Sequence, residues 1–303
     1  MPMIEVLRSS VNTWECDQMG HMNVRHYFGR ADAGLAMLGL QLGLPPRALR
    51  DTGLMLRAQD QHVRFNREMR PGTPYSVSAG VLDATAQGLR VYEEIRILGK
   101  SEVAAAITTQ LTLVDAAEQT QRSFGPPVLE RAHALRVELP EQGAPRGILR
   151  DTPRTPPMRT EAIERGLTGA YLGPLLLEDC DARGQMTEAA FMARISDGIA
   201  HFFRAIREGL RPDGVGGAAL EYRFVFHERP LLGDLIEVRT GLKGLGRKTL
   251  HLCHWVFDVE SGRCVATSEA VAVSFDLTTR KSVEIPDDIR VGLGKHVITG
   301  LSV

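Results

Sequence analysis

Residues 14–23 read Trp-Glu-Cys-Asp-Gln-Met-Gly-His-Met-Asn, and residues 178–187 read Glu-Asp-Cys-Asp-Ala-Arg-Gly-Gln-Met-Thr. The two stretches align without a gap, Trp14 on Glu178, and the alignment continues to position 36. Its identical pairs are Cys16/Cys180, Asp17/Asp181, Gly20/Gly184, Met22/Met186, Arg30/Arg194, Gly34/Gly198 and Ala36/Ala200. These seven identities over positions 16–36, where chance gives about one or two, indicate a duplicated domain.

Further matches lie downstream in slightly different register. Arg64-Phe65 aligns with Arg223-Phe224 and Arg70-Pro71 with Arg229-Pro230 in one common register, and Asp115 aligns with Asp276 in another. Small changes of register are typical of insertions and deletions in loops. We therefore predict two domains, residues 1–125 and 167–303. A proline-rich, extended linker at 126–166 joins them and contains a short helix near Val128–Arg136.

Each repeat shows the same order of elements: a short strand, an acidic loop, a long helix and several strands. Apolar residues at helical spacing predict a helix over Val24–Leu42 with Asn23 as its N-cap. The second helix starts after Thr187 and reaches about Glu208, where Gly209 and Pro212 end it.

Strand-like runs separated by glycine-containing turns follow each predicted helix. They are Met55–Phe65, Tyr75–Leu82, Gly88–Leu98, Val103–Val114, Ala219–Phe226, Leu235–Thr240, Thr249–Val259 and Cys264–Phe275. Short connections between consecutive strands indicate antiparallel sheets. The predicted fold class is α+β, with two tandem domains that each pack one long helix on an antiparallel sheet.

Composition and charge exclude several classes of protein. The 303 residues are 43% hydrophobic and 24% charged, with a net charge of −1, which gives no general attraction to nucleic acid or to an anionic membrane. No apolar run is long enough to span a bilayer. Glu5 and Arg8 interrupt the first apolar stretch, so no signal peptide is expected there.

The cysteines and histidines give no sign of a disulfide framework or a metal site. Cysteine occurs only at positions 16, 180, 253 and 264, without a Cys-x-x-Cys spacing, which indicates a reducing, cytoplasmic compartment. His251 and His254 are three residues apart in a predicted strand, so alternation places them on opposite faces. We predict no metal and no organic cofactor.

Asp17 is the residue most suited to chemistry. It precedes a turn made possible by Gly20 and a predicted helix that begins after Asn23. The first N–H groups of a helix have no partner inside it and can stabilise an oxyanion. A carboxylate beside them can act on water as a general base or attack directly as a nucleophile. We do not expect Cys16 or Cys180 to be the nucleophile, because each points away from the neighbouring Asp.

The run from Asp17 to Asn23, followed by Tyr27, resembles the Asp-x-x-Gly-His-x-Asn motif of the 4-hydroxybenzoyl-CoA thioesterase-like branch of the hotdog superfamily. The resemblance extends over residues 62–72 and to Ala104 and Asp115. It implies two hotdog domains that pair within one chain and hydrolyse an acyl-CoA substrate. Assembly of this intrachain pseudo-dimer into a larger homo-oligomer is left open.

The resemblance also implies which residues form the site. It maps the family's catalytic carboxylate onto Asp17, with Asp181 as its counterpart in the second repeat. We also predict catalytic roles for His21 and Asn23, and substrate contacts for Gly20, Tyr27 and Arg64. The basic residues Arg90, Arg247 and Lys248 at hairpins are further candidates for contacts with the phosphates of coenzyme A. In the second repeat His21, Asn23 and Tyr27 are replaced by Gln185, Thr187 and Phe191, so we expect an altered or degenerate second site.

Two other functions are compatible with parts of the sequence. The first is a hotdog module that binds or senses acyl-CoA without turnover, which the altered second repeat favours. The second is a hydroxyacyl dehydratase on the same fold, but the Gly20-His21 run lacks the prolines that the dehydratase motif carries after its catalytic His. Thioester hydrolysis is the function that we predict.

Overall fold

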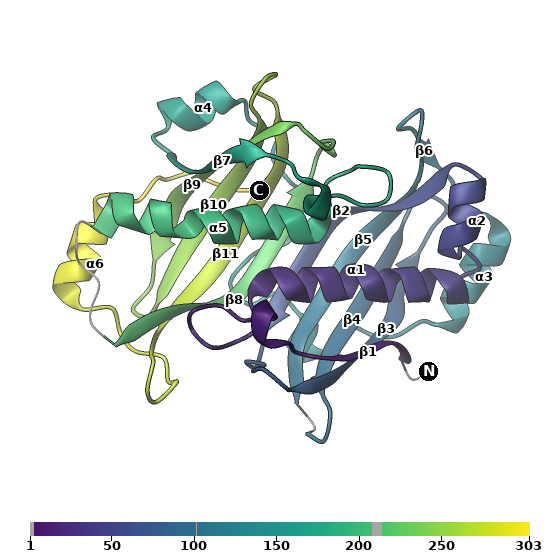
Figure 1. The fold of residues 1–303 in the computed structure, drawn as a ribbon, viewed down its shortest axis with the longest axis horizontal. Coiled ribbons are helices and arrows are strands. Elements are labelled where there is room, and N and C mark those ends of the chain that lie inside the picture. The colour runs from purple at the N-terminus through teal and green to yellow at the C-terminus, as the bar shows by residue number, and fades with distance from the viewer. Residues whose placement is uncertain (1–2, 101, 208–213) are drawn as a thin grey trace. The chain divides into compact units, whose positions relative to one another are not determined.

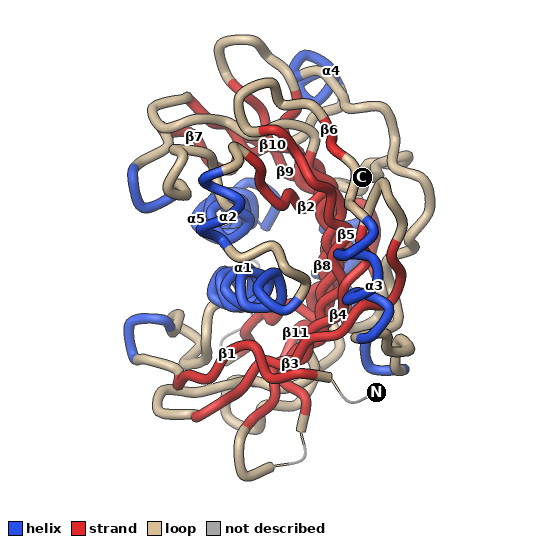
Figure 2. Tube along the Cα trace, turned by 90° about the vertical axis from the view of Figure 1, so that its right-hand side faces the viewer, coloured by secondary structure: helices blue, strands red, loops and turns tan. Residues whose placement is uncertain are grey.

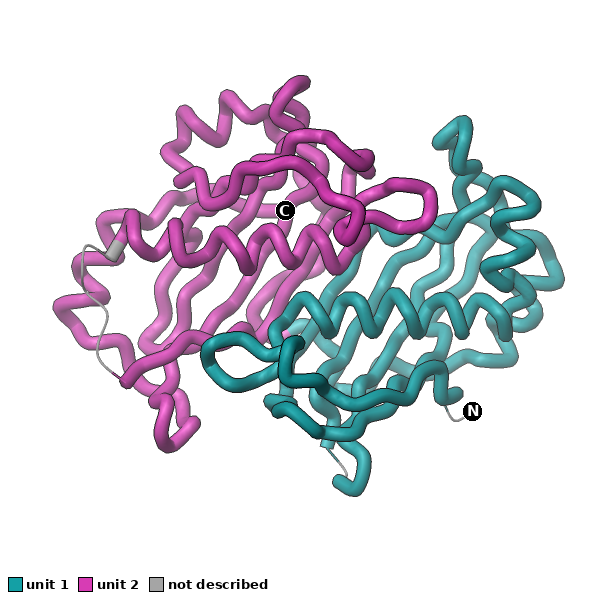
Figure 3. Tube along the Cα trace, in the orientation of Figure 1, with its two compact units in different colours: residues 1–145 teal, residues 146–303 magenta. Residues whose placement is uncertain are grey.

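A computed structural model describes residues 3–100, 102–207 and 214–303. The chain divides into two compact units, unit 1 at Met1–Pro145 and unit 2 at Arg146–Val303 (Figure 3). The division falls inside the predicted linker. Residues 126–145 thus belong to unit 1, where α3 (Pro126–Ala134) confirms the short helix expected there, and the remaining linker residues belong to unit 2.

Unit 1 is a five-stranded antiparallel sheet with one long helix on it (Figure 1). The helix is α1 (Val24–Gln41), and a short helix α2 (Pro46–Asp51) follows it. The strands lie in the order β1, β3, β4, β5, β2, and β6 (Gln121–Arg122) pairs with the end of β5. Their bounds are β1 Ile4–Ser10, β2 Leu54–Phe65, β3 Pro74–Ala84, β4 Leu89–Ile97 and β5 Val103–Asp115.

Unit 2 repeats this arrangement with α5 (Glu188–Arg207) as the long helix. Its strands lie in the order β7, β9, β10, β11, β8, all antiparallel. Their bounds are β7 Thr168–Pro174, β8 Val215–Phe226, β9 Leu235–Leu245, β10 Thr249–Asp258 and β11 Cys264–Asp276, and the short helices are α4 (Arg159–Glu164) and α6 (Asp287–Gly294). The predicted end of the long helix at Glu208, Gly209 and Pro212 lies outside the described residues.

The predicted fold of one long helix on an antiparallel sheet is confirmed in both units. In each, the helix lies against one face of its own sheet (Figure 2). Small residues allow the close approach in unit 1, where Ala31 and Gly34 are buried. A Cβ at Gly34 would overlap the carboxylate of Glu93 on β4, so a larger residue there would require that side chain to move.

Hydrogen bonds between strands define which residues of the two units are equivalent. Phe65 pairs with Ala105 in unit 1, and Phe226 pairs with Ala266 in unit 2, so Phe65 is equivalent to Phe226. The predicted alignments of Arg64-Phe65 with Arg223-Phe224 and of Arg70-Pro71 with Arg229-Pro230 are therefore wrong by two positions. The predicted alignment of Asp115 with Asp276 is confirmed. These residues are the last of the equivalent strands β5 and β11, and they are separated by the same number of positions as Phe65 and Phe226.

One strand boundary that we predicted from the glycines of the second repeat is wrong. The sequence predicted that a strand ends at Thr240 and that Gly241–Gly246 form a turn, but β9 continues to Leu245. Gly241 lies inside the strand, and the side chain of Leu301 occupies the space that a Cβ at this position would need. A glycine in a sequence can therefore indicate the close approach of another segment to a strand as well as a turn.

Candidate functional site

The loop between β1 and α1 is a tight turn that fixes Asp17. The Asp17 N–H donates to the carbonyl of His21 at 3.0 Å, and the Gly20 N–H donates to the carbonyl of Asp17 at 2.9 Å. Gly20 has φ of 75°, a conformation that favours glycine. The Met19 N–H donates to Oδ1 of Asp17 at 2.9 Å, so the carboxylate is held by its own turn.

Asn23 ends this loop and begins the helix. Its side-chain oxygen accepts a hydrogen bond from the Arg25 N–H at 3.0 Å, which confirms the predicted N-cap. The Asn23 N–H donates to the carbonyl of Glu15 at 2.8 Å. The amide of Val24, at the first helical position, has no acceptor within the helix. The loop therefore brings Asp17 to the amino-terminal end of α1.

The His21 imidazole lies between two carboxylates. Its Nε2 is 3.5 Å from Oδ2 of Asp17, and its Nδ1 is 3.3 Å from Oε1 of Glu68. The side chains of Asp17 and His21 are 19% and 12% exposed, so both are partly accessible to solvent. The predicted proximity of Asp17, Gly20, His21 and Asn23 is what the structure shows.

Glu68 is the member of this cluster that sequence reasoning missed. It lies in the loop after β2, far along the chain from Asp17. The main chain brings it into place, because the Met22 N–H donates to the carbonyl of Met69 at 2.8 Å. The only sequence signal was its position inside the run 62–72 that carries the family resemblance.

Tyr27 is buried beneath the loop rather than open to solvent. Its ring meets Phe65 edge-on, with centroids 5.1 Å apart, and its hydroxyl accepts a hydrogen bond from the Met69 backbone. Burial raises the pKa of Tyr27 far above its usual value, so its hydroxyl remains a proton donor. Burial, Asp17 and Glu15 raise the pKa of the neighbouring Cys16 thiol, which disfavours a thiolate nucleophile there.

A buried ion pair ties the loop to the helix in both units. In unit 1 the buried carboxylate of Glu15 pairs with Arg30 and accepts the Asn12 N–H at 2.7 Å. In unit 2 Arg194 donates to Asp179, which is fully buried, at 2.9 Å. Breaking such a pair leaves an unpaired buried charge, so these residues stabilise the geometry of both loops.

The equivalent loop of unit 2 has the same backbone but different side chains. Oδ1 of Asp181 accepts the N–H groups of Arg183 at 2.8 Å and Gln185 at 3.0 Å. Thr187 caps α5 by accepting the Ala190 N–H through its hydroxyl at 3.2 Å. The turn thus survives the loss of His and Asn, as its predicted capping residue implied.

The charge opposite the unit 2 loop is reversed. The register that makes Phe65 equivalent to Phe226 places Arg229 where unit 1 has Glu68. The Arg229 guanidinium donates to Glu188 at 2.5 Å and lies 4.5 Å above the ring of Phe226. An arginine paired within its own unit replaces the carboxylate that contacts His21 in unit 1.

The predicted basic contacts do not join either loop within its own unit. Arg64 donates to the carbonyls of Glu141 at 2.9 Å and Ala144 at 3.0 Å, which anchors the segment after α3. Arg90 lies on β4 five residues from Ile95, about 17 Å at the rise of a strand, toward the opposite end of the sheet from Phe65. Arg247 and Lys248 lie at the hairpin of β9 and β10, where Arg247 pairs with Glu284.

The described residues contain neither a candidate metal site nor a candidate membrane-spanning helix. Within 3–100, 102–207 and 214–303, no group of three or more His, Cys, Asp or Glu is placed to hold a metal ion. Over the same residues, no helix is long and apolar enough to cross a bilayer.

The sequence model of the thioesterase-like superfamily matches residues 11–162 and 175–293, so it covers most of both units. The chain belongs to the thioesterase-like superfamily. No curated protein matches it. The double match agrees with the duplicated loop, helix and sheet described above.

Solved structures with the same fold include two-domain thioesterases. An oleoyl thioesterase (putative) from Lactobacillus plantarum is 11% identical, with a TM-score of 0.68 over 90% of this chain and 96% of that one. A 12:0-ACP thioesterase from Umbellularia californica is also 11% identical, with a TM-score of 0.67 over 88% and 93%. At such identities the likeness shows the fold, which is the predicted tandem hotdog fold.

Proposed function

We propose that this chain hydrolyses acyl thioesters, with coenzyme A as the thiol carrier, at the site around Asp17. The observation that supports the proposal most is the arrangement of Asp17 and His21 at the amino-terminal end of α1. A partly exposed carboxylate, an imidazole 3.5 Å away and helix amides meet at this point. These are the groups that addition of water to a carbonyl requires.

The reaction follows from the positions of these groups. Asp17 accepts a proton from water, or attacks the thioester carbonyl itself, and the carbonyl oxygen gains negative charge. The first amides of α1, with the positive end of the helix dipole, stabilise that oxygen. Collapse of the tetrahedral intermediate breaks the carbon–sulfur bond and gives the acid or, where Asp17 attacked, a mixed anhydride that water then hydrolyses. The leaving thiolate takes up a proton from the water consumed, relayed by Asp17 and His21.

The remaining predicted residues have supporting roles in this proposal. Gly20 and Asn23 fix the backbone of the loop, and Tyr27 supports it from below. Arg90, Arg247 and Lys248 are proposed contacts for the phosphates of coenzyme A. Arg64 remains a proposed substrate contact, and its Nη1 also donates to the carbonyls of residues 141 and 144. Asp181 is the proposed carboxylate of a second, weaker site.

Turnover by the Asp17→Asn variant tests the proposal directly. Asn retains the oxygen that accepts the Met19 N–H, so the loop should keep its shape. It cannot take a proton at neutral pH, and turnover should fall by about 10² to 10⁴. A panel of acyl-CoAs of increasing chain length, with release of free thiol as the readout, provides the measurement. Unchanged turnover in a folded variant would remove Asp17 from the mechanism.

The same assay separates the carriers. Two acyl-ACP thioesterases, from Umbellularia californica and Bacteroides thetaiotaomicron VPI-5482, share the fold, so matched acyl-ACP and acyl-CoA substrates belong in the panel. Faster turnover of acyl-ACP than of the same acyl-CoA would contradict coenzyme A as the carrier but not thioester hydrolysis.

Binding without turnover is the second candidate, and the departures in unit 2 favour it for that unit. Gln185 cannot transfer a proton as His21 can, and Arg229 is paired with Glu188. Tight binding of acyl-CoA with no thiol release over the whole panel would favour this candidate over hydrolysis.

A further inference from the structure

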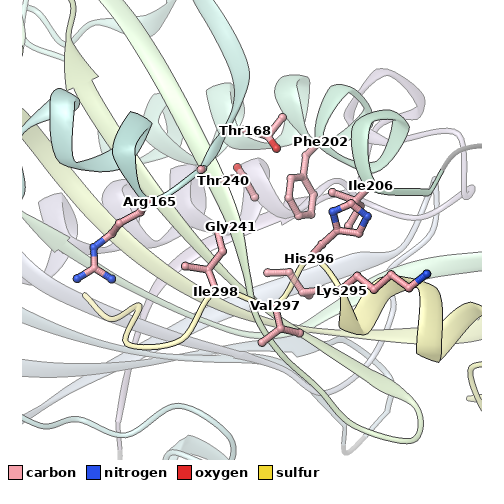
Figure 4. Close-up of a pocket in the computed structure, with 12 residues that line it drawn as sticks. Arg165, Thr168, Phe202, Ile206, Thr240, Gly241, Lys295, His296, Val297 and Ile298 are labelled. Atoms are coloured by element: carbon pink, nitrogen blue, oxygen red, sulfur yellow. The ribbon is translucent and has the colours of Figure 1, made fainter.

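Unit 2 contains a cavity of about 220 Å³ that lies apart from the Asp181 loop (Figure 4). Its walls come from the last turns of α5, from β9 and from the segment that follows α6. Thr187 caps the opposite end of α5, and Phe202 in the cavity wall is about 22 Å further along at the rise of a helix. The cavity is therefore a separate feature of this unit.

The lining combines an apolar wall with polar groups at both sides. Phe202, Ile206 and Ile298 supply the apolar surface. The buried Thr240 lies in β9 and its hydroxyl is 2.9 Å from Nδ1 of the fully buried His254. His296 stands on the exposed side, directly after α6.

Lys295 adds a positive charge beside His296. Its ammonium extends from the exposed rim of the cavity (Figure 4). Arg165 also lines the cavity, but its guanidinium points away from the other lining side chains and donates to Glu161 at 3.0 Å. The Lys295 ammonium and the His296 imidazole are therefore the groups that can meet a ligand at this rim.

Unit 1 provides an internal comparison at the same place in the fold. Leu242 pairs in parallel with Val297, and Val81 pairs in parallel with Arg136, so these two pairs are equivalent and share the register of the strands. At the positions of Thr240, Lys295 and His296, unit 1 carries Ala79, Ala134 and Leu135. Thr168 likewise corresponds to Ile4, because these residues begin the equivalent strands β7 and β1.

Each of these four differences replaces an apolar residue of unit 1 by a polar or cationic residue of unit 2, whereas the lining residue Val297 has Arg136 as its equivalent. The packing of unit 1 shows that the fold does not need polar groups at these positions. The Thr240 hydroxyl is already paired with His254, and Lys295 and His296 are exposed at the rim. A ligand with an apolar body and a negative end would satisfy both parts of the lining.

We propose that this cavity binds a small carboxylic acid with an apolar body, whose carboxylate lies at Lys295 and His296. The body packs on Phe202, Ile206 and Ile298, with the hydroxyl of Thr240 at the inner end. The volume equals that of roughly seven water molecules at ~30 Å³ each, which fits a short-chain acid. If the proposed hydrolysis occurs, such acids are also the class of its acyl product, but the binding site itself does not depend on that activity.

Calorimetric titration of the full chain with hexanoate tests the site. A variant that carries the unit 1 residues, Thr240→Ala with Lys295→Ala and His296→Leu, should bind hexanoate at least tenfold more weakly. The single variant Lys295→Ala changes only an exposed side chain and should weaken binding by several-fold. Lys281→Ala removes an equally exposed charge of unit 2 and should leave the affinity unchanged.

Two further arms make the result decisive. Hexan-1-ol, which has the same body without the charge, should bind much more weakly than hexanoate. The Asp17→Asn variant should retain hexanoate binding, which separates this cavity from the proposed catalytic site. Equal affinity of hexanoate for the wild type and the variant with unit 1 residues would overturn the proposal. Equal binding of hexan-1-ol and hexanoate would overturn it as well.

Discussion

The residues of the loop between β1 and α1 follow from local sequence, whereas Glu68, which contacts this loop from a distant part of the chain, does not. The sequence places Asp17, Gly20 and Asn23 because turn and cap chemistry act over a few residues. Glu68 reaches His21 only through the main-chain hydrogen bond between Met22 and Met69, and no local rule predicts such a contact. The same limit applies to the hydrogen bonds of Arg64 to the carbonyls of residues 141 and 144, which the sequence did not predict.

Glu68 is expected to position His21 rather than to react. Its Oε1 lies 3.3 Å from Nδ1, on the ring edge away from Nε2 and Asp17. The Glu68→Gln variant keeps a side chain of the same shape and removes the charge. We expect kcat to fall by roughly 10- to 100-fold, because misplacement of a catalytic group is costly, while KM changes little.

Rescue by a conservative variant separates a positioning role from a structural one. Glu68→Asp keeps the charge and should restore part of the loss in kcat, whereas a structural role would show as a lower melting temperature in both variants. A folded Glu68→Gln variant with normal kcat and KM would show that the contact has no part in catalysis.

Elements were predicted where a pattern repeats along the chain, and missed where tertiary contacts decide. The two long helices and the strands of both repeats are present, and β5 and β11 match the predicted runs within one residue at each end. The helices α2, α4 and α6 are short and were not predicted. Pro46 occupies the first turn of α2, where proline is well tolerated.

Equivalent strands carry ionisable residues of opposite kind in the two cores. Glu93 on β4 corresponds to His254 on β10, since Ala79 and Thr240 are their partners on the next strand. Both side chains are fully buried. Burial raises the pKa of Glu93 well above its usual value and lowers the pKa of His254 to about 3. Each residue is therefore held neutral, which gives the two units opposite responses to pH.

His254 should make unit 2 less stable in acid. Between about pH 6.5 and 3 the histidine binds a proton in the unfolded chain but not in the folded one, so stability falls as pH falls. One such group contributes about 1.4 kcal/mol per pH unit in this range. Urea unfolding between pH 6.5 and 4.5 should therefore show a shallower loss in His254→Gln than in the wild type.

The Glu93→Gln variant is the counterpart with the opposite sign. The unfolded chain releases the Glu93 proton above about pH 4.5, whereas the folded chain retains it, so the wild type loses stability as pH rises. The variant should gain on the wild type from pH 5 to 7. If both variants follow the wild-type pH dependence, neither buried group is held neutral as described.

At the scale of the whole molecule, duplication explains why the fold was predictable and the second site was not. Two copies of one domain repeat the same periodicities, so errors in one copy are visible against the other. The alignment of the two copies shifts between the loops, where Asp17 matches Asp181, and the strands, where Phe65 matches Phe226. Two chance dipeptide matches obscured this shift. Only the strand register could show that Arg229 stands where Glu68 does.

The two loops of the duplicated chain should contribute unequally to turnover. In unit 1, His21 and Glu68 accompany Asp17. In unit 2, Gln185 and Arg229 stand at the equivalent positions beside Asp181. Gln185 cannot exchange a proton at neutral pH, and the guanidinium of Arg229 is held by Glu188. The carboxylate of unit 2 therefore lacks the neighbours that orient water or return a proton.

Comparing Asp17→Asn with Asp181→Asn on the best substrate of the panel measures this inequality. In both variants the new side chain still offers an oxygen to the backbone N–H groups that hold the turn, so both should keep the melting temperature of the wild type. Asp17→Asn should lose about 10² to 10⁴ in kcat, and Asp181→Asn should keep most of it. Equal losses would mean that Asp181 supports catalysis without an imidazole or a second carboxylate beside it. A larger loss from Asp181→Asn would place the principal site in unit 2. In that case Glu68→Gln should leave kcat unchanged in the same assay.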